Sequence, residues 1–111
     1  MSLEKRVYSA LVVSASEQFA GTLTSLLPES GYSPVVTVSS AAAAGRALNE
    51  RTFDFLFINS PLPDDPGVRF AVDCFRTGGA VALLFVEAAL YDTVQARVVG
   101  HGVYLLPRPT S

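Results

Sequence analysis

The chain of 111 residues is poor in the residue types that build several common kinds of site. It contains one cysteine, Cys74, and one histidine, His101, so an internal disulfide is excluded and little is left for a zinc site. No apolar run approaches the roughly 20 residues of a membrane span, and the N-terminus lacks the pattern of a signal peptide. We therefore expect a cytoplasmic protein without a membrane partner.

Clustered basic residues are missing as well. Eight Lys and Arg residues against ten Asp and Glu residues give a formal net charge of −2, and no Lys/Arg cluster occurs along the chain. A nucleic-acid footprint on this domain is therefore not expected, and RNA would have to be bound by another segment. Half of the residues are hydrophobic, which predicts one packed domain rather than a disordered chain.

Apolar runs typical of strands alternate with segments of helical periodicity, as in α/β proteins with a parallel sheet. The predicted strands cover residues 7–13, 34–38, 53–58, 80–86 and 103–106. Two of the predicted helices cover residues 41–51 and 68–76. Two more are predicted from their apolar faces: the first helix has Phe19, Leu23, Leu26 and Leu27, and the fourth has Leu90, Val94 and Val98. This alternation predicts one doubly wound α/β domain whose five-stranded parallel sheet has the order 2-1-3-4-5.

In such a sheet, ligands bind at the carboxyl ends of the strands, beside the point where the strand order reverses. The strands over residues 7–13 and 53–58 meet at that point. The residues at the ends of these strands and of the two later ones are therefore the candidates for a site: Ser14, Ala15, Ser16, Asn59, Ser60, Phe85, Val86 and Arg108.

Residues 54–67 have the pattern of a buried strand that runs into a polar turn. They closely resemble the phosphoacceptor strand and loop of response-regulator receiver domains, the CheY-like domains of two-component signalling. Residues 10–17 resemble the first strand of the same family, and the resemblance covers nearly the whole chain. It implies a flavodoxin-like fold and a role in bacterial signal transduction.

The resemblance also assigns the family's functional positions to residues of this chain. Asn59 stands where the phosphoacceptor Asp would be, and Ser14 and Ala15 match the acidic pair that holds Mg²⁺ in active receivers. The switch positions match these residues: Phe85 or Val86 for the Thr/Ser at the end of the fourth strand, Tyr104 or Leu105 for the aromatic residue, and Arg108 for the Lys before a Pro.

These substitutions remove the family's phosphorylation chemistry. Mg²⁺ requires carboxylate oxygens, which Ser14, Ala15 and Asn59 do not supply. The amide nitrogen of Asn59 is a poor nucleophile because its lone pair is delocalised into the carbonyl. We therefore expect a pseudo-receiver that is not an enzyme, holds no metal or cofactor, and is not phosphorylated at the usual position.

Structural roles are the favoured interpretation for several of the polar residues at this site. Ser14 and Glu17 fit the S-x-x-E capping box at the start of a helix. Asn59 is expected to brace the loop that follows it, with a hydrogen bond to Arg108 across the vacated pocket.

The remaining polar residues that stand out in the sequence also have structural explanations. Asp64 and Asp65 lie in a turn rich in Pro and Gly, where we expect solvated acids that bond to their own backbone. Cys74 is expected to pack in the core. His101 is expected to interact with the C-terminus of a helix.

A closer resemblance concerns residues 11–17, 54–67 and 102–109. They look like degenerate receivers from clostridial-type bacteria, which continue into a coiled coil and an ANTAR output domain that binds RNA in transcription antitermination. The chain ends at Ser111, where the family's fifth helix should begin, so we expect that helix and any output domain to be missing from it. We also expect apolar residues of the fifth strand and of the fourth helix to form an exposed surface, which would favour self-association.

Two functions of different class follow. In the first, the domain is a protein-interaction and dimerisation module that controls an attached RNA-binding output without phosphorylation. In the second, it is a sensor whose vacated pocket binds a small neutral or anionic ligand through Ser14, Asn59 and Arg108. A third hypothesis keeps a phosphoacceptor, with Ser60 or Asp64 as the substitute.

Overall fold

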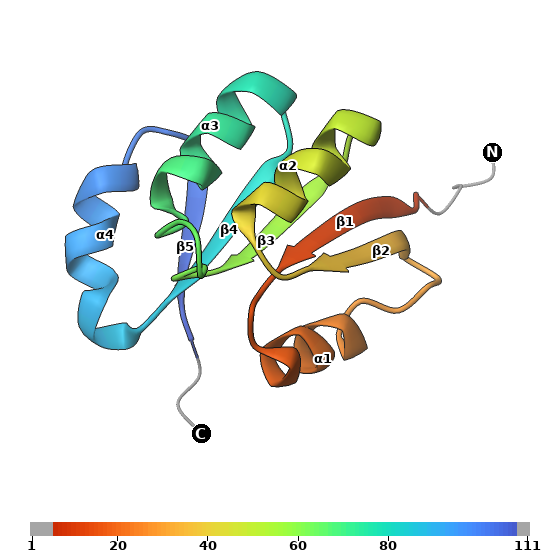
Figure 1. Ribbon diagram of the computed structural model, residues 1–111, viewed down its shortest axis with the longest axis horizontal. Helices are drawn as coiled ribbons and strands as arrows, with labels where there is room; N and C mark the ends of the chain where they lie inside the picture. The colour runs from red at the N-terminus through yellow and green to blue at the C-terminus, as the bar shows by residue number, and fades with distance from the viewer. Residues whose placement is uncertain (1–5, 109–111) are drawn as a thin grey trace, which may run out of the picture.

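The computed structural model describes residues 6–108, which form one five-stranded parallel sheet with helices on both faces (Figure 1). The strands are β1 (Tyr8–Val13), β2 (Tyr32–Val38), β3 (Phe55–Asn59), β4 (Val81–Val86) and β5 (Val103–Pro107). The helices are α1 (Glu17–Ser25), α2 (Ala41–Glu50), α3 (Val68–Gly78) and α4 (Tyr91–Val98), the last preceded by the 3₁₀ turn η1 (Ala88–Leu90). The strand order is β2-β1-β3-β4-β5, so the predicted α/β topology is confirmed.

The two faces of the sheet are covered unequally. The larger core cluster lies between the sheet and α2, α3 and α4, and the smaller one lies between the sheet and α1. On the larger side, α2 lies close to the sheet, since its Ala44 is completely buried. Among residues 6–108, no helix has both the length and the hydrophobicity needed to cross a membrane.

The central strands carry the most deeply buried side chains. Leu11, Leu56, Ile58 and Leu84 are fully buried. Each side chain of this kind contributes about 1.5–3 kcal/mol when it leaves water. Continuous apolar sequence is what a parallel strand covered on both faces requires, and it is why β1 and β3 could be recognised from the sequence.

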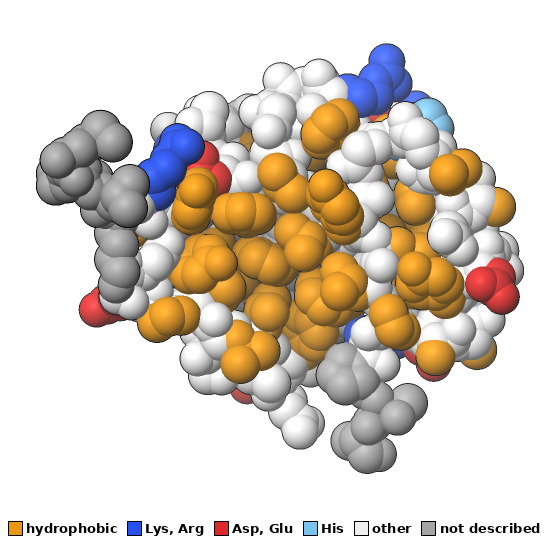
Figure 2. Space-filling view, turned by 180° about the vertical axis from the view of Figure 1, so that it is seen from behind, with side chains coloured by type: hydrophobic (Ala, Val, Ile, Leu, Met, Phe, Trp, Pro, Cys, Tyr) orange, Lys and Arg blue, Asp and Glu red, His pale blue; other side chains and the backbone are white. Residues whose placement is uncertain are grey.

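On the side of α1, the part of the sheet formed by β4 and β5 is left uncovered. Figure 2 shows this side as a continuous hydrophobic surface. We call it the bare face; its side chains are Val81, Leu83 and Phe85 of β4, Tyr104 and Leu106 of β5, and the neighbouring Phe55 of β3. Tyr104 is the most exposed of the large residues here, at 64%. The expected exposure of apolar residues on the fifth strand is therefore confirmed. The expected contribution of the fourth helix to this surface is wrong, because α4 packs against the other face of the sheet.

One predicted helix boundary is wrong. Leu26 was expected on the buried face of the first helix, but α1 ends at Ser25 and Leu26 is its C-cap, 68% exposed. The N–H of Leu26 turns back to the carbonyls of Leu23 and Thr24, so the chain leaves the helical path before the side chain can reach the sheet.

Candidate functional site

The candidate site lies at the carboxyl ends of β1, β3 and β5. Asn59 is the last residue of β3, Ser14 directly follows β1, and Arg108 directly follows β5. The parallel register pairs Val13 with Ile58, so the residues that come next, Ser14 and Asn59, are neighbours. The sheet thus brings together three residues from three distant parts of the sequence.

A chain of hydrogen bonds joins these three side chains. Asn59 Nδ2 donates to Ser14 Oγ at 3.1 Å, and Arg108 Nη1 donates to Asn59 Oδ1 at 3.3 Å. The guanidinium can only donate, so this contact fixes which end of the amide faces Arg108. The predicted bond between Asn59 and Arg108 is therefore confirmed. Ser14 and Asn59 are each only 5% exposed, while Arg108 is half-buried.

Ser14 is not the helix cap that the sequence suggested. The N-cap of α1 is Ser16, whose Oγ accepts from Phe19 N at 3.2 Å. Ser14 N still donates to Val38 O at 2.9 Å, so this residue belongs to the extended path of β1. Its hydroxyl accepts from Ser16 N and donates to Ser16 O, each at 3.0 Å. The expected capping box with Glu17 is wrong because the helix begins two residues too late for it.

The site supplies no anionic oxygen for a metal. Ala15 is exposed and has no polar side-chain atom, and the side chains of Ser14 and Asn59 are neutral. Within residues 6–108, no three His, Cys, Asp or Glu side chains come together as a metal site. A hard cation such as Mg²⁺ is held by carboxylates and phosphate oxygens, and this set of residues offers it neither.

The two candidates for the switch position at the end of β4 lie on opposite faces. Phe85 pairs directly with Asn59 and shares its face, where its ring packs edge-to-face on Phe19 with centroids 5.1 Å apart. Val86 is almost completely buried in the core beneath α3 and α4. The residue beside Asn59 is thus an aromatic ring that packs on α1 and carries no hydroxyl.

The two aromatic-switch candidates on β5 are also separated. Tyr104 pairs with Leu83 on the bare face, two residues before Leu106, which is the partner of Phe85. Leu105 packs into the larger core, and its carbonyl accepts from Tyr91 Oη at 3.5 Å. Neither residue takes part in the hydrogen bonds around Asn59.

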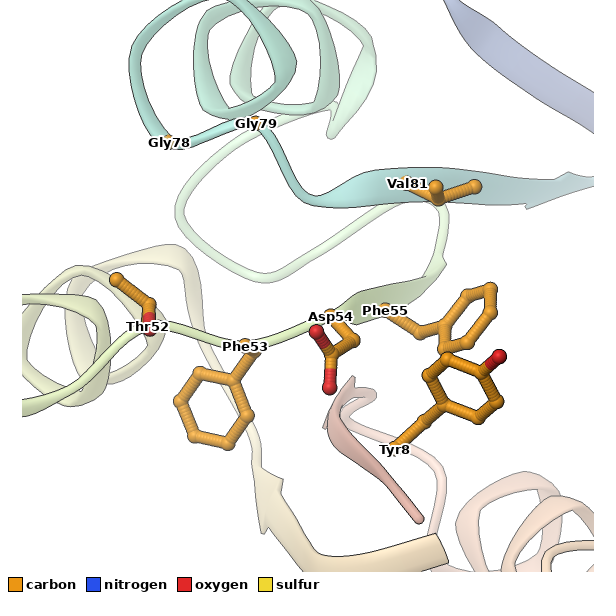
Figure 3. Close-up of a pocket in the computed structure, with 8 residues that line it drawn as sticks. All are labelled: Tyr8, Thr52, Phe53, Asp54, Phe55, Gly78, Gly79 and Val81. Atoms are coloured by element: carbon orange, nitrogen blue, oxygen red, sulfur yellow. The ribbon is translucent and has the colours of Figure 1, made fainter. Parts of the chain in front are cut away.

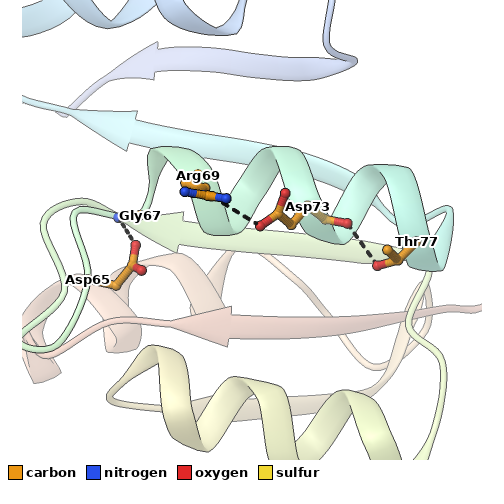
Figure 4. Close-up of polar contacts among 5 residues, drawn as sticks. All are labelled: Asp65, Gly67, Arg69, Asp73 and Thr77. Atoms are coloured by element: carbon orange, nitrogen blue, oxygen red, sulfur yellow. Dashed lines mark hydrogen bonds and ion pairs between the residues drawn. The ribbon is translucent and has the colours of Figure 1, made fainter.

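The loop after β3 is held by its own polar groups. Ser60 Oγ donates to Pro66 O at 2.5 Å, and Gly67 N donates to Asp65 Oδ1 at 2.6 Å (Figure 4). Asp65 thus bonds to its own turn, as predicted. Asp73, farther along α3 in the same view, lies 3.8 Å from Arg69 in an exposed i,i+4 pair of the kind that contributes little stability.

Asp64 has a role that the sequence did not indicate. Its carboxylate accepts from Ala41 N at 2.8 Å and from Ala42 N at 3.0 Å, so it caps α2 from a loop 23 residues away. These two bonds hold the pKa of Asp64 below its ordinary value. Asp64 is exposed to solvent, as predicted, but it also bonds to the start of α2, which was not predicted.

The single cysteine and histidine lie away from the site. Cys74 is buried in the core beneath α3, as predicted, and burial raises the pKa of its thiol to about 11, with a smaller contribution from Asp73. His101 is exposed just beyond α4, where its backbone N–H bonds to Val98 O at 3.0 Å.

A cavity of about 400 Å³ opens at the opposite edge of the sheet (Figure 3). Its lining residues are Tyr8, Thr52, Phe53, Asp54, Phe55, Gly78, Gly79 and Val81. Figure 3 shows the carboxylate of Asp54 between the rings of Phe53 and Phe55. None of the residues singled out from the sequence lies here, because these lining residues stand at the amino ends of the strands.

Comparisons with known proteins identify the fold. No protein-family model matches the chain, and no curated protein matches its sequence. The signal receiver domain of an HD domain-containing protein from Pseudomonas fluorescens Pf-5 superposes with a TM-score of 0.80 at 20% identity, covering 100% of this chain and 82% of that one. A CheY-like receiver domain from Methylobacillus flagellatus gives 0.72 at 21% identity, with 95% and 89% covered. A receiver domain protein from Clostridium thermocellum gives 0.78 at 17% identity, with 95% and 85% covered. The chain therefore has the fold of the CheY-like receiver domains of response regulators.

Proposed function

We propose that this domain is a pseudo-receiver: a signalling module that acts through protein contacts and without phosphorylation of the residue after β3. The observation that carries the proposal is the hydrogen-bonded chain from Ser14 through Asn59 to Arg108. At the position where a receiver would hold a reactive carboxylate, both polar atoms of a buried amide are already engaged.

The chemistry of phosphoryl transfer supports this proposal. Such transfer depends on positioning and on neutralising charge, usually with a metal ion. Ser14 and Ala15 provide no metal ligand of the necessary charge, and Asn59 provides no nucleophile. Arg108 is the one cation of this group, and its contact with Asn59 ties the end of β5 to the end of β3.

Treatment with acetyl phosphate and Mg²⁺, followed by intact-mass spectrometry, tests the proposal. We expect no adduct on the wild-type chain, and none on Asn59→Asp, because the metal ligands would still be missing. A stoichiometric adduct on the wild-type chain would overturn the proposal, and fragment mapping would show whether Ser60 or Asp64 carries it. An active receiver domain treated in parallel verifies the reagent.

The partners we propose are proteins: a second copy of the domain, or an output domain in the same polypeptide. Residues 11–17, 54–67 and 102–109 are similar to segments of degenerate receivers that continue into an ANTAR domain. This similarity supports an ANTAR output domain that binds RNA in transcription antitermination. RNA binding by a longer polypeptide, compared with none by this domain alone, would support that assignment. Equal RNA affinity of the two would contradict it.

One observation favours a second candidate, a ligand sensor. The guanidinium of Arg108 has five donors, and a single side-chain contact of 3.3 Å engages it among the described residues. A small anion could use the free donors. Thermal-shift measurements with phosphate, sulfate and carboxylates should then show stabilisation that Arg108→Ala abolishes, and the absence of any shift would rule the sensor out.

A further inference from the structure

The sheet has two edges, formed by β2 and β5, and they are protected differently (Figure 1). A strand at an edge presents unpaired N–H and C=O groups to a further strand. Arg108 N donates to Val86 O, so the alternate residues Leu105 and Pro107 direct their backbone groups away from β4. Pro107 has no N–H to offer, and the carbonyl of Leu105 already accepts from Tyr91 Oη at 3.5 Å. The outer edge of β5 is therefore a poor partner for another strand.

The outer side of β2 has free backbone groups in its second half. Ser14 N donates to Val38 O at 2.9 Å, which shows that Val38 directs its backbone groups toward β1. These groups alternate in direction along a strand, so those of Val36 also face β1, while those of Val35 and Thr37 face away from it. Among residues 6–108, β2 pairs with β1 alone, and the N–H and C=O groups of Val35 and Thr37 are left for a partner.

This edge also lacks the features that usually keep sheets apart. Natural edge strands are protected by charged side chains, especially Lys, and by Pro. No charged residue occurs between Glu29 and Arg46. The one proline of β2, Pro34, comes before the free stretch, beside the irregularity in the pairing with β1. The outer edge from Val35 to Val38 is thus open and uncharged.

The free stretch is complementary to itself in the antiparallel direction. With a two-fold axis beside Val36, Val35 of one copy lies opposite Thr37 of the other, and Thr37 lies opposite Val35. Opposed residues of this kind exchange both of their N–H···O bonds, so every outward group of the stretch finds a partner. All of the opposed side chains are β-branched, and such pairs stabilise strands.

The helices leave room for this pairing. α1 and α2 lie on opposite faces and contact the sheet mainly at β1, one strand in from the edge. Neighbouring strands are about 4.8 Å apart, so the β1 strands of two joined copies would be separated by about 14 Å. This distance exceeds the helix diameter of about 10 Å. The first residues of α2 are the alanines Ala41 to Ala44, whose side chains are too short to cover the edge.

We propose that the β2 edge is a homodimer interface, at which two copies pair antiparallel about Val36 and form one continuous sheet. A second copy fits better than a flexible peptide, because ordering a peptide costs about 1–2 kcal/mol per residue, whereas β2 is already held by its own sheet. The inference rests on the proposed interaction function and names the surface through which the domain meets its second copy.

Amide hydrogen exchange of the wild-type domain, followed by NMR at a low and a high protein concentration, tests the pairing. In the monomer, the amides of Val35 and Thr37 face water, whereas those of Val36 and Val38 bond to β1. Exchange at Val35 and Thr37 should slow about tenfold once nine-tenths of the chains are dimeric, because it then requires the remaining monomer. Exchange at Val36 and Val38 should not depend on concentration. Mixed labelled and unlabelled copies should show contacts between Val36 of one copy and Val36 of the other.

A substitution at one outward position locates the contact. Thr37→Pro removes an outward N–H and leaves the bonds to β1 intact, which an edge strand allows. The two-fold axis repeats the loss, so the dimerisation constant from sedimentation equilibrium should weaken about tenfold or more. Thr37→Val is the matched control, because it keeps the N–H and changes only an exposed side chain, and it should dimerise like the wild type. If Thr37→Pro does not fold, the exchange pattern of the wild type decides the question.

Other outcomes overturn the proposal. One is a domain that remains monomeric at the concentration of the NMR sample. Another is a dimer that Tyr104→Glu disrupts and Thr37→Pro does not, since this would place the contact on the bare face. Protection of Val35 and Thr37 that persists on dilution would show that another segment of the chain covers the edge. A phosphoryl adduct, in contrast, would overturn only the function without phosphorylation and leave the pairing of the edges standing.

Discussion

Removal of the Asn59 side chain tests whether the site stabilises the fold. Asn59→Ala deletes the donor to Ser14 Oγ and the acceptor for Arg108, at a position only 5% exposed. Ser14 keeps its two bonds to Ser16, so no buried hydroxyl is left without a partner. The substitution therefore removes two hydrogen bonds and creates a small cavity without introducing an unsatisfied group.

The expected loss follows from the two bonds. A typical hydrogen bond contributes about 1 kcal/mol to stability, and bonds to charged groups contribute more. The bond from Arg108 is 3.3 Å long and half-exposed, so we assign it about 1 kcal/mol as well. We expect the free energy of unfolding to fall by about 2 kcal/mol and the Tm to fall by roughly 10 °C. Arg108→Ala should lose about 1 kcal/mol, and the double variant should show a coupling of about 0.5–1 kcal/mol.

Urea unfolding, monitored by circular dichroism, gives the free energies of unfolding of the wild type, the two single variants and the double variant. Together they form a double-mutant cycle. Arg46→Ala serves as the control, because Arg46 is exposed on α2 and its loss should change stability by about 0.5 kcal/mol or less. If the losses from Asn59→Ala and Arg108→Ala simply add, the two side chains do not interact in solution. The account of the site as a hydrogen-bonded brace would then be wrong.

Two further predictions concern other parts of the fold. Gly102 has φ +78°, and a Cβ there would collide with the ring of Phe75. Gly102→Ala should therefore lower the free energy of unfolding, measured in urea, by about 2 kcal/mol or more. Gly78→Ala is the control and should change the stability little, because the space around Gly78 is open. Because the pKa of Asp64 is lower in the folded than in the unfolded state, its stabilisation is complete above the ordinary pKa near 3.8 and is lost as the pH falls through the lower folded value. Asp64→Asn should therefore be less stable than the wild type at pH 6 and approach it in acid; an unchanged difference would refute the cap.

Most of the architecture could be predicted because it depends on local patterns. The apolar runs of β1, β3 and β4 and the intervening helical periodicities were enough to give the order of the sheet. The contact between Asn59 and Arg108 was also predictable, since both residues follow parallel strands and such ends meet at one edge. The family resemblance added the expected roles, and the residues themselves showed which chemistry was missing.

Other contacts depend on hydrogen bonds between distant parts of the chain, which no short sequence pattern reveals. Two serines precede α1, but Ser14 still follows the path of β1, with its N–H bonded to Val38 of β2. The helix therefore begins only at Glu17, and Ser16 is its cap. Asp64 caps α2 although 22 residues separate it from Ala42, because the loop after β3 returns to the start of that helix.

The sequence by itself determined the class of fold, the order of the strands and the loss of the phosphoacceptor carboxylate. The tertiary structure alone decided that Phe85 shares a face with Asn59 while Val86 is buried on the other side, and that the face of β4 and β5 beside α1 is left uncovered. The reason is that neighbouring residues on a strand point to opposite faces, and only the packing of the helices decides which face is covered.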